Sequence, residues 1–436
     1  MGRMHRLLGA IGNPHHQLQV VHVAGTKGKG STTAMLASVL QAAQYSVGTY
    51  TSPHVITLRE RISIDGKPIS EVAFDGLING LETDLIRARE EEGSALSHFE
   101  VMTALAFKYF QDQQVDIAIV EAGLGGARDA TNVFSSDTLK LAIITAIGLE
   151  HQKALGDSLR EIAAAKAGIM KKGRPVVIAR QPEAEALQEL QKSAGERGCE
   201  IVQASDVVNL TSKGIIDVEG QRQQRATMSF SAETSGNVGE GASASDSDAE
   251  VSLKLMDAIA KGLSAANLLG RFQLVRLARA SEQEPPWLVL DGAHTPASAG
   301  ALVKTLAQVF PDQPLAFVVG MADDKDHRGF LAQLREANPK AVVFTSVPIA
   351  GAQQRSAAPG MLAANWQAVG LQLRRPQRCR ELIKASLASA VEAARRELMA
   401  TRQQGTGVVC VCGSLHAVSE ALCTVPFQEQ DACIHA

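Results

Sequence analysis

A short strand, a glycine-rich loop and the start of a helix follow one another directly between residues 20 and 33. Residues 20–23 are mostly apolar, as in a buried strand, and an Ala- and Leu-rich stretch from Ser31 predicts a helix. The glycines of the loop are Gly25, Gly28 and Gly30. Loop N–H groups and a helix N-terminus bind phosphate, Lys29 can reach the outer phosphates, and a hydroxyl can contact Mg²⁺. The sequence therefore predicts a nucleotide-binding site.

The spacing of this loop differs from that of the usual phosphate-binding loop. From Gly25 it reads G-T-K-G-K-G-S, which is shorter before the lysine and places a glycine between the lysine and Ser31. A flexible turn without a ligand is the alternative interpretation. The strand and the helix on either side of the loop disfavour it.

Composition restricts the class of protein. A chain of 436 residues predicts two or three domains, and 45% hydrophobic with 20% charged residues is typical of a soluble globular protein. The net charge of −3 predicts no general attraction to nucleic acid, and no apolar run is long enough to predict a membrane helix. Six cysteines without a CxxC pair predict neither a zinc site nor a disulfide framework. We expect a cytoplasmic location, or a mitochondrial or plastid one if the chain is truncated at its N-terminus.

The first part of the chain alternates strands and helices, which predicts a parallel sheet with crossover helices. Ser70 resembles an N-cap because an acidic first helical turn follows it. We expect strands over residues 20–24, 115–121, 141–147 and 175–179, and helices over 31–44, 71–91, 99–112 and 158–170.

A second α/β unit is expected after the Pro285-Pro286 break. The expected domains are 1–280 and 286–436. Residues 231–250 carry no Lys or Arg and almost no large apolar side chain, which predicts a disordered insertion. In the second unit we expect strands over 287–290, 315–319, 341–345 and 407–411, and helices over 297–309, 327–337 and 381–400.

Polar residues follow several of the expected strands. Glu121 ends an apolar strand, and a glycine-rich segment with a polar cluster comes next. A carboxylate at this end of a parallel strand is placed to hold Mg²⁺ beside a phosphate loop, although a simple strand-end turn remains an alternative. His151 follows another strand and is a plausible metal or phosphate contact there, although a lone histidine is more often a surface or core residue. By helix statistics alone, Lys166 is an ordinary exposed lysine. The polar cluster after Glu121 consists of Arg128, Asp129, Thr131 and Asn132.

The second unit repeats this arrangement. Asp291 and His294 follow the expected strand 287–290, and Ser414 and His416 follow the strand near 407–411. Polar ends of neighbouring parallel strands converge on one edge of a sheet. With Arg271 shortly before the break, these residues suit a domain that closes over a nucleotide held by the first domain.

Together these motifs resemble the folylpolyglutamate synthase/dihydrofolate synthase family of Mur-type amide ligases, over nearly the whole chain. The segments that carry the resemblance are HVAGTKGKGST, YTSPHV, the FE of SHFE, EAGLGGARDATNV, HQKALGDSLREIAAAKAGI, GRFQ and LDGAH. GGARDATNV, the Thr of DGAHT and the run MADDKDH are most similar to plant-type dihydrofolate synthases. The resemblance implies a P-loop, Mur-ligase-like ATPase domain and a smaller Rossmann-like glutamate-ligase domain.

The resemblance also implies roles for single residues. The family carbamylates the lysine that matches Lys166. The ATP contacts would be Gly28, Lys29, Gly30, Ser31, Arg271 and Asp291. The ligands of Mg²⁺, expected as two ions, would be Ser52, Glu121 and His151. The substrate side would be lined by Ser97, His98, Phe99, Glu100, Arg128, Asp129 and Ala130. The catalytic residues would be Lys29, Lys166, His294 and Ser414.

The chain departs from the family pattern in several places. The Gly-x-His-Gln…Asn segment that the family carries before residue 255 is not recognisable, so its Asn contact to the nucleotide is in doubt. The single substitutions relative to the pattern are Glu150 for Asp, Ala165 for Glu, Leu269 for Pro and Thr295 for Asn.

The activity that the resemblance implies is ATP-dependent joining of L-glutamate to dihydropteroate through an acyl phosphate. The alternatives are folylpolyglutamate synthase, one enzyme with both activities, a P-loop ATPase that is not a ligase, and a catalytically impaired homologue. The expected partners are small molecules only, and the expected state is a monomer.

Overall fold

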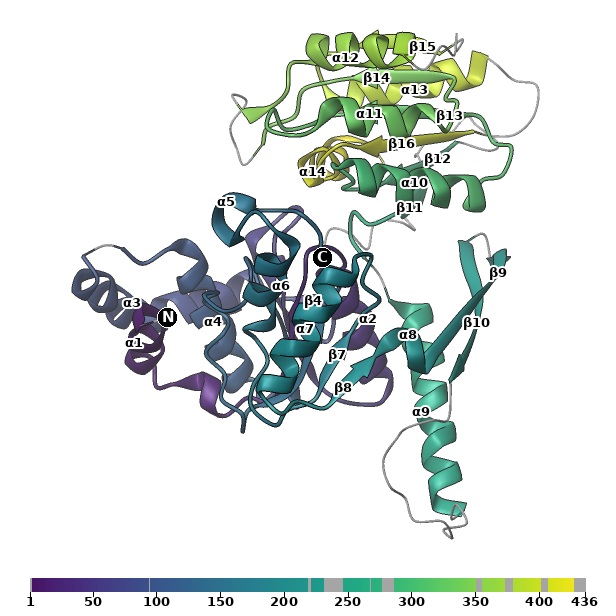
Figure 1. The fold of residues 1–436 in the computed structure, drawn as a ribbon. Coiled ribbons are helices and arrows are strands. Elements are labelled where there is room, and N and C mark those ends of the chain that lie inside the picture. Colours follow the sequence, from purple (N-terminus) through teal and green to yellow (C-terminus); the bar gives the residue numbers. More distant parts are fainter. Residues whose placement is uncertain are drawn as a thin grey trace. The chain divides into compact units, whose positions relative to one another are not determined.

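The computed structural model describes residues 2–93, 95–218, 221–230, 246–266, 268–276, 286–349, 355–372, 379–400 and 407–426. The chain divides into two compact units (Figure 1). The first comprises Met1–Leu210 and Met228–Asn267, and the second Thr211–Thr227 and Leu268–Ala436. The expected domain limits of 280 and 286 remain a prediction. No helix among the described residues has the length and apolar character needed to span a membrane.

The first unit contains a sheet of eight strands in the order β4-β3-β2-β5-β1-β6-β7-β8. All neighbours from β2 to β8 pair in parallel, whereas β3 and β4 are antiparallel and make the sheet mixed. The strands are β1 (Val20–Ala24), β2 (Val47–Tyr50), β3 (Ile62–Ile64), β4 (Lys67–Pro68), β5 (Ile117–Glu121), β6 (Leu139–Ile144), β7 (Val176–Ile178) and β8 (Ile201–Gln203).

Helices connect these strands. The helix expected over 71–91 is present with those bounds, and the other expected helices of this unit differ by a few residues at their ends. The helices are α1 (Gly2–Ala10), α2 (Lys29–Ala42), α3 (Glu71–Glu91), α4 (His98–Asp112), α5 (Gln152–Leu155), α6 (Leu159–Ala167), α7 (Ala184–Glu196), α8 (Ala204–Val207) and α9 (Asp246–Ala265), with 3-10 turns at Pro14–His16 and Leu58–Arg61.

Strand β1 lies between β5 and β6, and this placement decides where the polar loops meet. Val23 pairs with Glu121, and Ala24 pairs with Ile144. The carboxyl ends of these three parallel strands therefore share one edge of the sheet, which is where ligands bind in open α/β sheets.

Helix α9 begins inside the segment that we expected to be disordered. Residues 246–250 belong to α9, and residues 231–245 lie outside the described residues. The helix packs closely on α2, since a Cβ at Gly262 would lie 2.4 Å from the Cα of Val39. The hydroxyl of Ser38 donates to the carbonyl of Gly262 at 2.6 Å. Strands β9 (Val208–Val218) and β10 (Gln221–Phe230) form a separate two-stranded sheet.

The second unit contains a six-stranded sheet in the order β11-β12-β16-β13-β14-β15. It is parallel except for β11, which pairs antiparallel to β12. The strands are β11 (Gln273–Arg276), β12 (Trp287–Leu290), β13 (Leu315–Val319), β14 (Ala341–Phe344), β15 (Arg380–Ile383) and β16 (Val408–Cys412). The helices are α10 (Pro296–Val309), α11 (His327–Arg335), α12 (Pro359–Gln372), α13 (Leu387–Ala400) and α14 (Leu415–Thr424).

One expected helix was wrong in its first part. Residues 380–383 form β15, which pairs in parallel with β14, and the helix expected over 381–400 begins only at Leu387. Pairing with the edge of the sheet outweighed local helix propensity at these residues. Ser386 lies just before this helix, and its hydroxyl accepts from the backbone N–H of Ser389 in the first helical turn at 3.3 Å.

A buried histidine gives the first unit a dependence on pH. His15 is 2% exposed, and burial together with the nearby His16 and His5 lowers its pKa to about 4. The folded state therefore favours neutral His15, whose contribution to stability is complete above pH 6.5 and is lost as pH falls toward 4. We expect the free energy of unfolding to fall by about 1 to 2 kcal/mol from this residue between pH 7 and pH 5. Urea titrations at both pH values check this, and His15→Gln is expected to lose less stability than the wild type; an equal loss would contradict the prediction.

Candidate active site

The loop between β1 and α2 has the backbone geometry of a phosphate cradle. Gly25 has φ of 151°, and a Cβ there would lie 1.8 Å from the hydroxyl oxygen of Thr145. Gly28 is the N-cap of α2 with φ of 89°, in the left-handed region. Only glycine fits both positions easily. The helix begins at Lys29, so its first N–H groups are placed to bind an anion.

Lys29 and Glu121 face one another across the sheet edge. The Lys29 Nζ lies 3.7 Å from Oε1 of Glu121, whose side chain is only 4% exposed. The other carboxylate oxygen accepts the backbone N–H of Ser52 at 3.3 Å. The structure thus brings together three residues that the sequence placed far apart.

Lys166 is not the exposed lysine that helix statistics suggest. It is 4% exposed, and its Nζ donates to the carbonyl oxygen of Gly25 at 2.7 Å. Burial, followed by the charge of Lys29, lowers its pKa to about 8. Lys166 is therefore in direct contact with the phosphate loop and holds a neutral amine more readily than an exposed lysine does.

The loop after β6 is fastened to the phosphate loop. The backbone N–H groups of Thr26 and Lys27 both donate to the carbonyl of Ala146, at 2.9 and 3.2 Å. Lys27 also forms an ion pair with Glu150. The next residue, His151, is the N-cap of α5 with φ of 55°, which is uncommon outside glycine. His151 is thus placed on a loop attached to the cradle.

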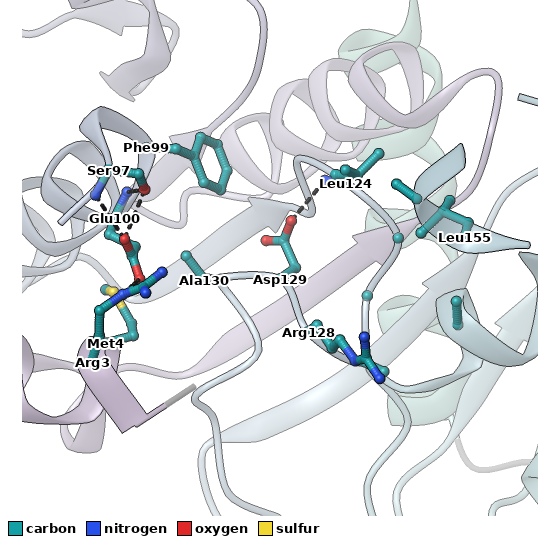
Figure 2. Close-up of a pocket in the computed structure, with 15 residues that line it drawn as sticks. Arg3, Met4, Ser97, Phe99, Glu100, Leu124, Arg128, Asp129, Ala130 and Leu155 are labelled. Carbon is teal, nitrogen blue, oxygen red and sulfur yellow. Dashed lines mark hydrogen bonds and ion pairs between the residues drawn. The ribbon is translucent and has the colours of Figure 1, made fainter. Parts of the chain in front are cut away.

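A cavity of about 650 Å³ lies in the same unit (Figure 2). Six of the expected substrate residues line it, whereas His98 is exposed and is not among the lining residues. Ala165 lines it next to Lys166, so the cavity wall adjoins the phosphate-loop contacts. The lining residues are Arg3, Met4, Ser97, Phe99, Glu100, Leu124, Gly125, Gly126, Ala127, Arg128, Asp129, Ala130, Ala154, Leu155 and Ala165.

Arg3 and Met4 were missed by sequence reasoning. They lie on α1, and no motif marks them. The Nε of Arg3 donates to Oε1 of Glu100 at 3.2 Å. Glu100 is held at the start of α4, because its other oxygen accepts from the backbone N–H of Ser97 at 2.8 Å. Figure 2 shows this chain of contacts at one side of the cavity.

Asp291 is held by two backbone hydrogen bonds in the second unit. Its two oxygens accept the backbone N–H groups of Phe272 and Ala293, both at 2.8 Å. Burial nonetheless raises its pKa above the ordinary value. A Cβ at position 292 would lie 2.8 Å from Nη1 of Arg271. Glycine at this position therefore leaves room for the Arg271 guanidinium next to Asp291.

His294 and Ser414 follow neighbouring strands, as expected. Nδ1 of His294 lies 2.8 Å from the carbonyl oxygen of Gly292. The hydroxyl of Ser414 donates to the carbonyl of Gly320 at 2.9 Å and accepts the N–H of Ala417 as the N-cap of α14. Since β12 pairs with β16, both residues lie at one edge of the second sheet.

The residues around Glu121 suit a magnesium ion. Mg²⁺ is usually held by one or two carboxylates together with water and substrate phosphates. Buried Glu121, with the Ser52 segment and a phosphate cradle beside it, provides such a set. No group of three or more His, Cys, Asp or Glu side chains that could hold a metal without further ligands occurs among the described residues.

Comparison with known proteins identifies the family. Residues 23–275 match the Mur ligase middle domain, and residues 270–415 match the Mur ligase glutamate ligase domain. The dihydrofolate synthase/folylpolyglutamate synthase of Bacillus subtilis is 34% identical over 79% of this chain and 80% of that protein. The chain belongs to the folylpolyglutamate synthase/dihydrofolate synthase family of Mur ligases.

Solved structures of family members match the same architecture. The folylpolyglutamate synthase of Mycobacterium tuberculosis, complexed with ADP and AMPPCP, has a TM-score of 0.77 at 27% identity over 96% of this chain and 94% of that chain. A bifunctional folylpolyglutamate synthase/dihydrofolate synthase with Mn, AMPPNP and L-glutamate bound has a TM-score of 0.70 at 30% identity over 97% of this chain and 93% of that chain. The two-domain fold and the ATP-dependent ligase class are therefore confirmed.

Proposed function

We propose that this protein joins L-glutamate to dihydropteroate at the expense of ATP. The observation that carries the proposal is the adjacency of a phosphate cradle and a substrate-sized cavity, linked by Lys166 and Ala165. A cavity of about 650 Å³ is within the range of small-molecule sites. Six of the substrate residues named from the resemblance line it.

The reaction needs activation because a carboxylate is a poor electrophile. A carboxylate oxygen of dihydropteroate attacks the γ-phosphorus of ATP, ADP leaves, and an acyl phosphate forms. The α-amine of glutamate then attacks the carbonyl carbon, loses a proton, and expels inorganic phosphate together with that carboxylate oxygen. Lys29 and the loop N–H groups disperse the charge on the transferred phosphoryl group.

The remaining assignments are part of the same proposal. Gly28, Gly30 and Ser31 bind phosphates with Lys29. Ser52, Glu121 and His151 would hold Mg²⁺, expected as two ions, which would neutralise phosphate charge there. In the second unit we assign nucleotide contacts to Arg271 and Asp291, and catalytic contacts to His294 and Ser414. The polar side chains of these four residues all follow or adjoin the end of a strand.

We also propose that Lys166 is carbamylated. Its neutral amine adds to carbon dioxide with loss of a proton, and its pKa of about 8 makes that amine available near neutral pH. Protein in ¹³C-bicarbonate is expected to give one carbamate resonance that is absent from Lys166→Arg, and removal of carbon dioxide is expected to lower activity about tenfold or more. Full activity without carbon dioxide would contradict the proposal.

Folylpolyglutamate synthase is the second candidate, alone or combined with the first activity. It is supported by relatives that carry both names, such as the B. subtilis protein. Purified protein with ATP and labelled glutamate, offered dihydropteroate and tetrahydrofolate side by side, separates the candidates. Product from dihydropteroate supports our proposal, product from tetrahydrofolate alone supports the second candidate, and bound ATP without any amide product indicates a catalytically impaired homologue.

A further inference from the structure

A buried histidine on β1 is joined to the cavity by hydrogen bonds. His22 is 0% exposed. It is the one polar residue of β1, whose other residues are three valines and an alanine. Its Nε2 lies 2.8 Å from the hydroxyl oxygen of Thr131. That hydroxyl donates to Oδ1 of Asp129 at 2.6 Å, and Asp129 lines the cavity.

The hydrogen-bonding groups fix where the protons lie. Asp129 accepts the backbone N–H groups of Leu124 and Thr131 at 2.6 and 3.0 Å, in addition to the Thr131 hydroxyl. Thr131 has one hydroxyl proton and gives it to Asp129, so it can only accept from His22. His22 therefore carries its proton on Nε2, and its Nδ1 has no hydrogen-bond partner among the described residues.

The surroundings keep His22 neutral and fixed. Burial, with the charge of Lys171, lowers its pKa to about 3. Its ring packs edge-on against Phe134 with 5.6 Å between ring centroids. A neutral, immobile ring offers the Thr131 hydroxyl a donor of constant direction.

Hydrogen bonds from Leu124 and Thr131 orient the carboxylate of Asp129, which lines the cavity. Figure 2 shows the Asp129 carboxylate turned toward the Leu124 backbone in the middle of the cavity loop. Because the bonds to Leu124 N–H and Thr131 fix both oxygens, the lone pair that remains for a ligand points in one direction. Removing the Thr131 hydroxyl takes away one of the two hydrogen bonds that Oδ1 of Asp129 accepts, which holds the carboxylate less tightly, and it leaves the His22 N–H buried without an acceptor.

We propose that His22 and Thr131 are positioning residues that set the substrate-facing direction of Asp129, so that they control binding of the pteroate substrate and not of ATP. This rests on the proposed function only for the identity of the substrate. His22 lies on β1, the strand that leads into the phosphate loop. Its hydrogen bond nevertheless goes to Thr131, in the segment after β5 that lines the cavity.

Two matched pairs of variants test the proposal. Thr131→Val removes the hydroxyl at nearly constant volume, and Thr131→Ser keeps it. His22→Leu removes the donor, and His22→Gln keeps one at similar reach. We expect Thr131→Val and His22→Leu each to raise the KM for dihydropteroate about tenfold, with kcat and the KM for ATP within about twofold of wild type. Thr131→Ser and His22→Gln are expected to keep the KM for dihydropteroate close to that of the wild type. The variant that combines Thr131→Val with His22→Leu is expected to have a KM for dihydropteroate no higher than either single variant.

Several results would overturn the proposal. Equal changes in both KM values, an unchanged KM for dihydropteroate, or no rescue by Thr131→Ser would each do so. If the His22 variants do not fold, the Thr131 pair decides, and ¹⁵N NMR of the wild type must show the Nε2–H tautomer at neutral pH. If the wild type makes no amide product, the proposed function fails separately, and calorimetry with dihydropteroate still measures the predicted loss of binding.

Discussion

Lys29→Ala is expected to reduce ATP-dependent ligation by about a thousandfold while the protein stays folded. Lys29 is the first residue of α2, where alanine is well tolerated, and its ammonium lies 3.7 Å from Glu121 at the phosphate cradle. The loss falls on turnover because the ammonium stabilises charge that develops only on the transferred phosphoryl group. Steady-state rates with ATP, glutamate and dihydropteroate, together with the thermal midpoint, check this prediction.

A second lysine of the same loop provides the control. Lys27 forms an ion pair with Glu150, and its side chain is 41% exposed. Lys27→Ala therefore removes an ion pair that solvent screens and that contributes little to stability. We expect its turnover to stay within about threefold of wild type. Near-normal activity of Lys29→Ala, or equal losses in both variants, would contradict the assignment of Lys29.

Glu121→Gln is expected to lower turnover by about a hundredfold or more and to raise the half-saturating Mg²⁺ concentration at least about tenfold. Glutamine keeps the size of the side chain and an acceptor for the N–H of Ser52, so the change removes chiefly the charge. A neutral amide is a much weaker ligand for Mg²⁺ than a carboxylate. Initial rates across a Mg²⁺ titration measure both effects.

Asp137→Asn is the matched control. Glu121 is the last residue of β5, and Asp137 is an exposed carboxylate on the connection from β5 to β6. Asp137→Asn is expected to leave the Mg²⁺ dependence unchanged. If Glu121→Gln showed an unchanged Mg²⁺ dependence with full turnover, Glu121 could not be a metal ligand.

The sequence predicted most of the regular structure where local patterns and tertiary contacts agree. The β1 strand and the phosphate loop, the helix over 71–91 and the strand over 287–290 follow from apolar runs, glycines and a cap, and they are present with the expected bounds. The strand at 380–383 could not be predicted in this way, because its partner, β14, is distant in sequence. Short edge strands depend on such pairing more than on their own residues.

The residues of the candidate site also fall into two groups, those that the sequence could locate and those that only the fold reveals. Glu121, His151 and Asp291 could be located because Glu121 ends an apolar strand and the other two each follow one. Arg3 could not, since its place in the cavity depends on an ion pair with Glu100, across 97 positions of sequence. His22 carried a signal that was missed, namely one polar residue within a run of valines. Its partner Thr131 is 109 positions away and could be identified only from the fold.

The measurement that tests the central claim most directly follows an oxygen atom. Dihydropteroate labelled with ¹⁸O in its carboxylate is incubated with purified protein, ATP, Mg²⁺ and L-glutamate, and the inorganic phosphate is analysed by mass. An acyl phosphate intermediate transfers one ¹⁸O to phosphate for each amide formed, with ADP as the other product. Unlabelled phosphate, or cleavage of ATP to AMP and pyrophosphate, would contradict the account.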